Sequence, residues 1–290
     1  MGLLYWFQSI RHPALDVIVG LVTRLGEETV FMVLGLFILW CVDKKWGFRF
    51  LLAGMVGSVV NQLLKAIFLI PRPWVLDPEF TIVESAREAA TGYSFPSGHS
   101  SGSVANYTSI GAFLKKKWAW AVGILIPLLV GLSRFCVGVH FPTDVLFGWA
   151  LGLSVVLLAP FFQKKFEKRW VFYLIILLLA VPGWFYCKTN DFYTSYGMMV
   201  GFFAGDLFEE KYVKFKNTKC WWKMILRVLG GGAVYFALNA LLKMPFSSSF
   251  LHAGTFLSYL VRAIRYAVIL FVDVAIYPLC FDRIKFGKKA

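Results

Sequence analysis

The chain has 290 residues, of which 59% are hydrophobic, 18% aromatic and only 16% charged. Its apolar residues come in repeated runs of the length that a bilayer requires, which predicts an all-α fold, a polytopic transmembrane helical bundle. A soluble core of this size would carry more charge and more one-sided periodicity, so the composition argues against a soluble globular protein.

The net charge of +14 would suit a nucleic-acid binder, but the positions of the basic residues argue against that partner. Twenty of the thirty Lys and Arg residues lie in five short segments between or after apolar runs. This is the positive-inside pattern, and it predicts contact with anionic lipids of the bilayer and no nucleic acid. The segments hold Lys44, Lys45 and Arg49; Lys115 to Lys117; Lys164, Lys165, Lys168 and Arg169; Lys211 to Arg227; and Arg283 to Lys289.

The amino-terminal segment Met1 to Arg24 has apolar residues at helical spacing and lacks the pattern of a removable signal peptide. We expect residues 1–28 to form an amphipathic interfacial segment at one membrane surface. The first crossing follows at about Thr29 to Val42, with Glu27 and Glu28 at its outer start. Such acidic residues usually cap a helix, and the alternative is that a glutamate neutralises a functional cation.

A second crossing, about Phe48 to Ile70, starts from a basic loop and ends outside. Its last turns carry Asn61 and Lys65 on one face. A lysine near a helix end can simply snorkel to the headgroups. Arg72 follows between two prolines, however, so the helix ends there and the guanidinium is held close to the end of the helix.

The longest non-apolar insertion, Trp74 to Phe95, has an acidic balance that fits the outer side. It closes with Pro96-Ser97-Gly98-His99, directly before an apolar run to Leu114. Because a turn of Pro, Ser and Gly at a helix start leaves backbone N–H groups free, this turn predicts an anion site.

The next crossing, about Trp118 to Leu132, returns the chain to the outer side. There Arg134, His140 and Asp144 concentrate polarity in an otherwise apolar region. If this stretch is helical, the four-residue spacing places Asp144 one turn beyond His140 on the same face. The carboxylate would then orient the imidazole and raise its basicity.

The remaining apolar runs bring the total to about nine crossings, with eight as the alternative. The amino terminus is then outside and the basic carboxyl terminus cytoplasmic. We divide the bundle into a core at 29–187 and a carboxyl-terminal extension at 188–290 that packs on it. The remaining runs are Val145 to Phe162, Trp170 to Cys187, Thr194 to Phe208, Met224 to Leu242 and Phe256 to Phe281.

Six polar residues fall at the outer ends of crossings two to five under this topology, and helices joined by short loops pack as neighbours. Three permanent cations in one partly dry cavity repel one another unless an anion lies between them. Phosphate fits, because arginine forks match its oxygens and lysine adds a point charge. The six are Lys65, Arg72, His99, Arg134, His140 and Asp144.

Phosphoryl transfer needs charge neutralisation, an in-line nucleophile and a proton for the departing oxygen. In this site His140 can attack phosphorus while Asp144 orients it, and His99 can protonate the leaving group and then activate water. No Asp/Glu cluster offers a magnesium site, so we expect a metal-independent reaction without a cofactor. The groups that can neutralise the phosphate are Lys65, Arg72, Arg134, the Ser97 hydroxyl and the amides of Gly98 and His99.

The three motifs together resemble the signature of the type 2 phosphatidic acid phosphatase superfamily. The order, the internal spacings and the gaps of 22 and 33 residues all fit, and the resemblance covers about Thr29 to Phe162. The motifs read Lys65, six residues, Arg72-Pro73; then Pro96-Ser97-Gly98-His99; then Ser133-Arg134, five residues, His140, three residues, Asp144.

The resemblance implies a five-to-six-helix phosphatase core with its site at the outer membrane face, in the plasma membrane of a bacterium. It implies that His140 is the nucleophile and forms a phosphohistidine, that Asp144 orients it, and that His99 is the acid and base. The phosphate cradle that it implies consists of Lys65, Arg72, Ser97, Gly98 and Arg134.

Three functions stay open on the sequence. The first is hydrolysis of a lipid phosphate such as undecaprenyl pyrophosphate, phosphatidylglycerol phosphate, phosphatidate or a sphingoid phosphate. The second is phosphotransfer from one lipid to another acceptor, and the third is non-enzymatic transport or binding of an anion or lipid phosphate. The sequence specifies neither the lipid nor the oligomeric state.

The extension carries further polar residues, Asn239, Lys243, Arg262 and Arg265, toward its outer half. Snorkelling and interhelical hydrogen bonds would account for them. Our hypothesis is that Arg262 and Arg265, one turn apart, bind a second phosphate or an anionic headgroup. Glu27 and Glu28 are further candidates for secondary contacts at the headgroup.

Overall fold

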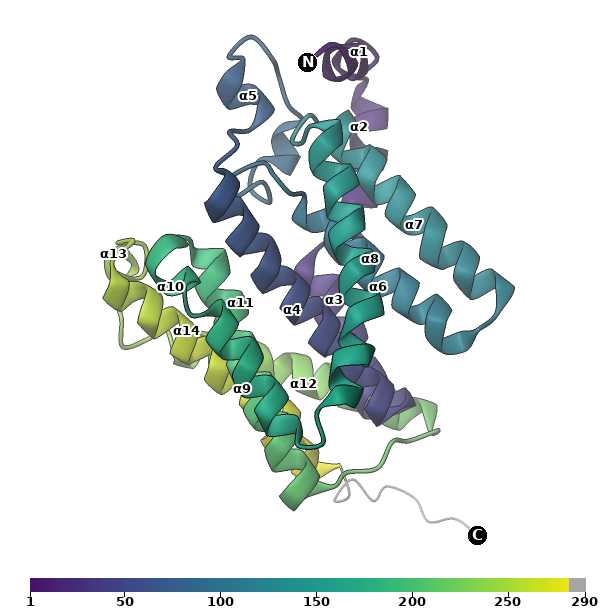
Figure 1. Cartoon of the computed structure of the whole chain (residues 1–290), viewed down its shortest axis with the longest axis vertical. Coiled ribbons are helices and arrows are strands. Elements are labelled where there is room, and N and C mark those ends of the chain that lie inside the picture. Colours follow the sequence, from purple (N-terminus) through teal and green to yellow (C-terminus); the bar gives the residue numbers. More distant parts are fainter. Residues whose placement is uncertain (282–290) are drawn as a thin grey trace. The chain divides into compact units, whose positions relative to one another are not determined.

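The computed structural model describes residues 1–281, and every regular element in that range is helical (Figure 1). This confirms the all-α class. The chain forms two compact units, which are described separately. The first comprises Met1–Met32 and Val56–Phe161, and the second comprises Val33–Met55 and the chain from Phe162 onward. The basic segment Arg283 to Lys289 lies outside the described residues. The division at residues 28 and 187 stays a prediction.

The first unit is built on α4, α6, α7 and α8, with shorter helices at its amino terminus and in the long insertion. Proline occupies the first turn of several of these helices, where its missing N–H costs nothing. The elements are α1 (Gly2–Ser9), α2 (Pro13–Arg24), the start of α3 (Glu28–Phe37), the second half of α4 (Lys44–Phe68), α5 (Pro73–Leu76), α6 (Gly98–Leu114), α7 (Lys117–Cys136) and α8 (Pro142–Lys165).

Glycines on α8 allow α6 to pack against it backbone to backbone. A Cβ added at Gly148 would lie 2.7 Å from the carbonyl oxygen of Ser97, and one added at Gly152 would lie 2.3 Å from that of Ser101. Such an approach is open only to residues without a side chain. The starts of α6 and α8 are therefore held together.

The second unit contains α9, α11, α12 and α14. Gly197 and Gly201 of α11 approach α14 so closely that an added Cβ would lie 2.2 and 2.1 Å from the carbonyl oxygens of Ala263 and Ala267. The α14 helix continues through a π-helical turn at Val272–Ile276 and a 3-10 turn at Tyr277–Cys280, and two further π-helical turns lie at Ile38–Val42 and Glu209–Val213. The helices of this unit are α9 (Arg169–Ala180), α10 (Gly183–Tyr186), α11 (Asn190–Phe208), α12 (Trp221–Leu241), α13 (Ser248–Leu251) and α14 (Phe256–Phe271).

Six helical segments of the described chain are long and apolar enough to cross a membrane. A seventh crossing results if α2 and the helix Glu28–Val42, which meet at an angle of 44°, count as one broken span. Two further predicted crossings correspond to α6, which has 17 residues, and α11, and neither is among the six. The polytopic character is confirmed, whereas the number nine stays a prediction.

Candidate active site

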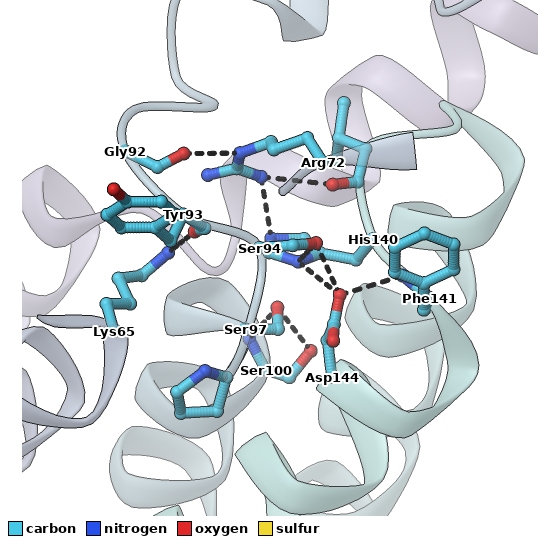
Figure 2. Close-up of polar contacts among 12 residues, drawn as sticks. Lys65, Arg72, Gly92, Tyr93, Ser94, Ser97, Ser100, His140, Phe141 and Asp144 are labelled. Carbon is cyan, nitrogen blue, oxygen red and sulfur yellow. Dashed lines mark hydrogen bonds and ion pairs between the residues drawn. The ribbon is translucent and has the colours of Figure 1, made fainter. Parts of the chain in front are cut away.

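His140 and Asp144 meet at the start of α8, as Figure 2 shows, with His140 Nδ1 3.2 Å from Asp144 Oδ2. The sequence predicted this contact for the wrong reason, because His140 lies in the linker before α8 and only Asp144 lies in its first turn. The same carboxylate oxygen accepts the Phe141 N–H at 2.8 Å and the Ser94 hydroxyl at 2.5 Å. Three donors thus hold one oxygen of Asp144 in place.

The second ring nitrogen of His140 faces a cation. Arg72 Nη1 lies 3.2 Å from His140 Nε2 (Figure 2). A guanidinium can only donate, so Nε2 must accept. Nδ1 therefore carries the ring proton and donates it to Asp144. This tautomer leaves the lone pair of a neutral imidazole at Nε2, where a nucleophile would need it.

Arg72 is anchored by backbone carbonyls of two loops. Its Nε donates to the Gly92 oxygen at 3.0 Å, its Nη2 to the Thr91 oxygen at 2.5 Å, and its Nη1 to the Val139 oxygen at 3.0 Å. The next carbonyl, of Tyr93, accepts a hydrogen bond from Lys65 Nζ (Figure 2). One three-residue stretch of the insertion thus gathers both cations beside His140.

The predicted anion turn forms the start of α6. Ser97 caps the helix, and its Oγ accepts hydrogen bonds from the Ser100 N–H at 3.4 Å and the Ser100 hydroxyl at 2.9 Å. The Ser97 N–H itself donates to the Asp144 carbonyl at 3.0 Å. Because α6 begins at Gly98, the amides of Gly98 and His99 belong to the first turn, which has no intrahelical acceptors. The turn offers the donors that an anion needs.

Asn61 supports this turn from α4. Its Nδ2 donates to the Pro96 carbonyl at 3.3 Å, and it is 2% exposed. Its Oδ1 would lie 3.5 Å from a Cβ added at Gly98. Asn61 and Lys65 share a face of α4, as predicted, and that face reaches both the turn and the insertion.

Arg134, which is buried, and His99, which is half-buried, lie beside the break between α2 and α3. Arg134 is fully buried, and its Nη1 donates to the Thr23 hydroxyl. Within residues 1–281, the Nε and Nη2 atoms of Arg134 and the Nε2 atom of His99 have no hydrogen-bond partner. Gly26 lies against His99, since an added Cβ would be 3.0 Å from the His99 carbonyl oxygen.

The two glutamates of the helix break differ in their surroundings. Glu27 is half-buried and interacts electrostatically with Arg134, while Glu28 is exposed in the first turn of α3. The remaining predicted contacts, Arg262 and Arg265, lie on α14 of the second unit. The first unit therefore brings together all eight residues predicted for catalysis and phosphate binding.

Two residues of the site were missed by sequence reasoning. Ser94 is the polar residue just before the Phe95-Pro96 step, and its place in a polar turn was a weak signal. Thr23 carried no signal, because nothing in the chain links it to Arg134, 111 positions away. Only the tertiary structure identifies these partners.

Burial and nearby cations determine the charge state of His140. This residue lies in the linker between α7 and α8, outside both helices. Burial lowers the pKa of His140 well below its usual value, and the positive charges of Arg72 and Arg134 lower it further. His140 is therefore neutral at pH 7, in agreement with the tautomer that its neighbours require.

The charge balance of the site favours an anion. Three cations, Lys65, Arg72 and Arg134, stand against two carboxylates, those of Asp144 and the half-buried Glu27. Two buried donors on Arg134, Nε and Nη2, have no acceptor within residues 1–281. The described residues contain no group of three or more His, Cys, Asp or Glu arranged to hold a metal. This arrangement suits a phosphate, because the arginine side chains and the amides at the helix start can bind its oxygens while the imidazole of His140 attacks phosphorus.

Comparisons with known proteins point to one family. The model of the PAP2 superfamily matches residues 46–168, and that of the PAP2 superfamily phosphatase transmembrane extension matches residues 193–289. Phosphatidylglycerophosphatase B of Bacillus subtilis is 32% identical over 176 residues, which cover 55% of this chain and 80% of that protein. The undecaprenyl-diphosphatase of Sulfolobus acidocaldarius is 30% identical over 176 residues, which cover 56% of this chain and 81% of the relative.

A solved structure also matches. It is the crystal structure of the transmembrane PAP2-type phosphatidylglycerolphosphate phosphatase of Bacillus subtilis, with a TM-score of 0.48 and 30% identity. The match covers 58% of this chain and 85% of that one. The two sequence relatives match this chain over little more than half its length.

Proposed function

The chain belongs to the PAP2 superfamily, and we propose that it is an integral membrane phosphatase that hydrolyses a phosphomonoester or pyrophosphate of a lipid. The observation that carries this proposal is the state of His140. Its Nε2 lone pair faces Arg72, and its Nδ1 proton is directed to an Asp144 carboxylate that two further donors hold. A histidine prepared in this way is a nucleophile for phosphorus.

In the first step His140 Nε2 attacks phosphorus, and the bond from phosphorus to the leaving oxygen breaks. His99, which is protonated when the anionic substrate is bound, gives its proton to that oxygen. The ring of His140 becomes positively charged when Nε2 is phosphorylated, and the Asp144 carboxylate stabilises that charge. Arg72 exchanges its hydrogen bond to Nε2 for one to a phosphate oxygen, where it joins Lys65.

In the second step water attacks the phosphohistidine and His99 takes its proton. The bond from phosphorus to Nε2 breaks, inorganic phosphate leaves, and His140 returns to its neutral state. Arg134, with Nε and Nη2 facing no acceptor in the described chain, stabilises the equatorial oxygens in both steps. Thr23 positions Arg134. The Ser97 hydroxyl and the amides of Gly98 and His99 complete the cradle.

The substrate that we propose is a lipid phosphate of the kind named for the relatives, a phosphatidylglycerol phosphate or undecaprenyl diphosphate. The acidic insertion and the basic loops support a site at the outer face of a bacterial plasma membrane, with the carboxyl terminus in the cytoplasm. We propose that the reaction requires no metal, since the phosphate charge is met by Lys65, Arg72 and Arg134.

The test is a phosphate-release screen of purified protein against lipid mono- and diphosphates, with EDTA in a parallel series. His140→Ala should abolish release. His252→Ala is the matched control and should leave release unchanged, because His252 is exposed and interacts with Ser248. Rapid quenching with ³²P-labelled substrate should trap acid-labile label on the wild type and none on His140→Ala.

Three outcomes would contradict the proposal. Turnover by His140→Ala would exclude the phosphohistidine, and loss of activity in EDTA that added Mg²⁺ restores would exclude metal independence. Disappearance of the substrate without release of inorganic phosphate, with label on a second lipid, would identify a phosphotransferase.

A further inference from the structure

Two arginines lie one turn apart inside α14, a segment of the second unit that is apolar enough to span a membrane. Arg265 is 3% exposed and Arg262 is half-buried. In the described part of the chain, neither forms an ion pair with a carboxylate. This is an unusual place for two permanent positive charges.

Three other cationic side chains of the same unit, which are buried or half-buried, have partners. Arg169 binds both carboxylate oxygens of Asp206 at 3.0 Å, and Lys44 lies 2.5 Å from a carboxylate oxygen of Glu209. Arg227 donates to two backbone carbonyls and lies over the ring of Phe281 at 4.0 Å. The arginines of α14 therefore stand out within their own unit.

Within residues 1–281, the arginine pair on α14 has one side-chain hydrogen bond, one ring contact, from the Arg265 guanidinium to Tyr266 at 5.9 Å, and no carboxylate partner. Arg265 Nη2 donates to Asn239 Oδ1 on α12 at 3.0 Å. The Nε atoms of both arginines are buried and have no hydrogen-bond partner within residues 1–281. Asp273, two turns further along the chain, is fully buried, and its carboxylate likewise lacks a partner there, so it does not neutralise the pair.

Two like charges that repel each other in a medium of low dielectric constant become stable when an anion binds between them. Guanidinium forks match the oxygens of a phosphate, and Asn239 keeps its amide N–H groups for a further bond. Ile264 and Val268, which are neighbours of the arginines along α14, and Phe236, one turn before Asn239 on α12, are apolar and exposed, with exposures of 54%, 39% and 68%. A lipid chain can lie on such residues while its headgroup reaches the arginines.

We propose that Arg262, Arg265 and Asn239 form a binding site for the phosphate group of an anionic phospholipid, separate in its residues from the catalytic site. The site lies wholly within the second unit, on residues matched by the model of the transmembrane extension. It would make the stability of the extension depend on the anionic lipid content of the membrane.

The experiment uses the full-length protein in phosphatidylcholine nanodiscs that contain increasing fractions of phosphatidylglycerol. Native mass spectrometry counts retained lipids, and thermal unfolding gives Tm. We expect Tm of the wild type to rise and saturate. Arg262→Gln combined with Arg265→Gln should weaken this response at least about tenfold in apparent affinity.

The matched control, Lys216→Gln with Lys219→Gln, removes the same charge from exposed positions of the same unit and should respond like the wild type. His140→Ala should also bind the lipid normally, so the result does not depend on whether the proposed reaction is correct. If the double glutamine variant fails to fold, Arg262→Lys alone decides the question. It keeps the charge but loses the fork, so it should weaken lipid binding measurably.

Equal lipid responses in the wild type and the double glutamine variant would overturn the proposal. Stabilisation of the wild type by inorganic phosphate to the same extent, in discs without phosphatidylglycerol, would assign the site to free phosphate instead. The double glutamine variant could instead bind phosphatidylglycerol normally and have a higher KM for a lipid diphosphate but not for a lipid monophosphate. That result would assign the arginines to the second phosphate of the substrate and overturn the proposal.

Discussion

Replacing Ser94 by alanine tests whether the contacts around Asp144 prepare His140 for attack. Ser94 is fully buried, and its hydroxyl donates to Asp144 Oδ2 at 2.5 Å. The replacement removes one of three donors on that oxygen and leaves the His140 and Phe141 N–H groups. Because Asp144 must stabilise the positive ring of phosphorylated His140 in a fixed orientation, the loss should affect the chemical step.

The size of the effect follows from the type of hydrogen bond. A bond to a charged group contributes about 1.5–3 kcal/mol, which corresponds to a factor of roughly 10 to 150 in rate if it is lost entirely in the transition state. Two donors remain on Oδ2, so the lower end applies. We expect kcat of Ser94→Ala to fall about tenfold, with KM unchanged within about twofold.

The assay measures phosphate release from a lipid phosphate in mixed micelles at saturating substrate. Ser103→Ala is the control, since Ser103 is also fully buried and its hydroxyl donates to the Ser100 carbonyl at 2.9 Å within α6. That variant should keep kcat within about twofold of the wild type. If Ser94→Ala had the kcat of the wild type, or if both variants lost the same amount, the proposed role of the Ser94 contact would be wrong.

Three further predictions concern other parts of the site. Burial and the positive charge of Arg72 lower the pKa of His140, so the acid limb of the pH profile of kcat/KM should lie below pH 6.5, the usual pKa of histidine. Arg72→Gln should move this limb to higher pH, and a limb that stays in place would exclude an effect of Arg72 on the pKa of His140. Thr23→Val should lower kcat about tenfold, by releasing Arg134, and Thr23→Ser should restore it; equal losses in both variants would indicate a packing role. Arg72→Lys should lower kcat/KM at least about tenfold in the same assay, because one ammonium nitrogen with three donors cannot serve His140 Nε2 and three carbonyls, which three guanidinium nitrogens contact in the wild type; retention of wild-type kinetics would show that charge alone suffices.

The proposed site also depends on the amino-terminal helices, which lie outside the match to the PAP2 superfamily model at 46–168. Thr23 contacts Arg134, Gly26 lies against His99, and the Leu25 carbonyl accepts the Tyr107 hydroxyl at 3.1 Å. Two of these contacts place the break between α2 and α3 against predicted site residues, and the third joins the break to α6. We expect truncations that remove α2 to lose activity even where the three motifs are intact.

The amino-acid sequence was enough to predict the fold class and the clustering of the residues in the proposed site. Long apolar runs can satisfy their backbone groups in a bilayer only as helices, so helical class follows from composition. The spacings around Arg72, His99 and His140 place each motif at a helix end or in the turn next to it. Short connections between the helices then bring those ends together. Local chain geometry was therefore enough to predict eight site residues.

The partners of those residues became visible only in the folded chain. Thr23 meets Arg134 across 111 positions and Ser94 meets Asp144 across 50, and side-chain packing, not local spacing, selects such pairs. In the folded chain His140 lies in the linker before α8. There Arg72 faces Nε2, which keeps its lone pair, and Asp144 accepts the proton on Nδ1. Spacing along a chain limits which residues are near in space, but the tautomer and the burial of a side chain depend on neighbours that only the folded chain supplies.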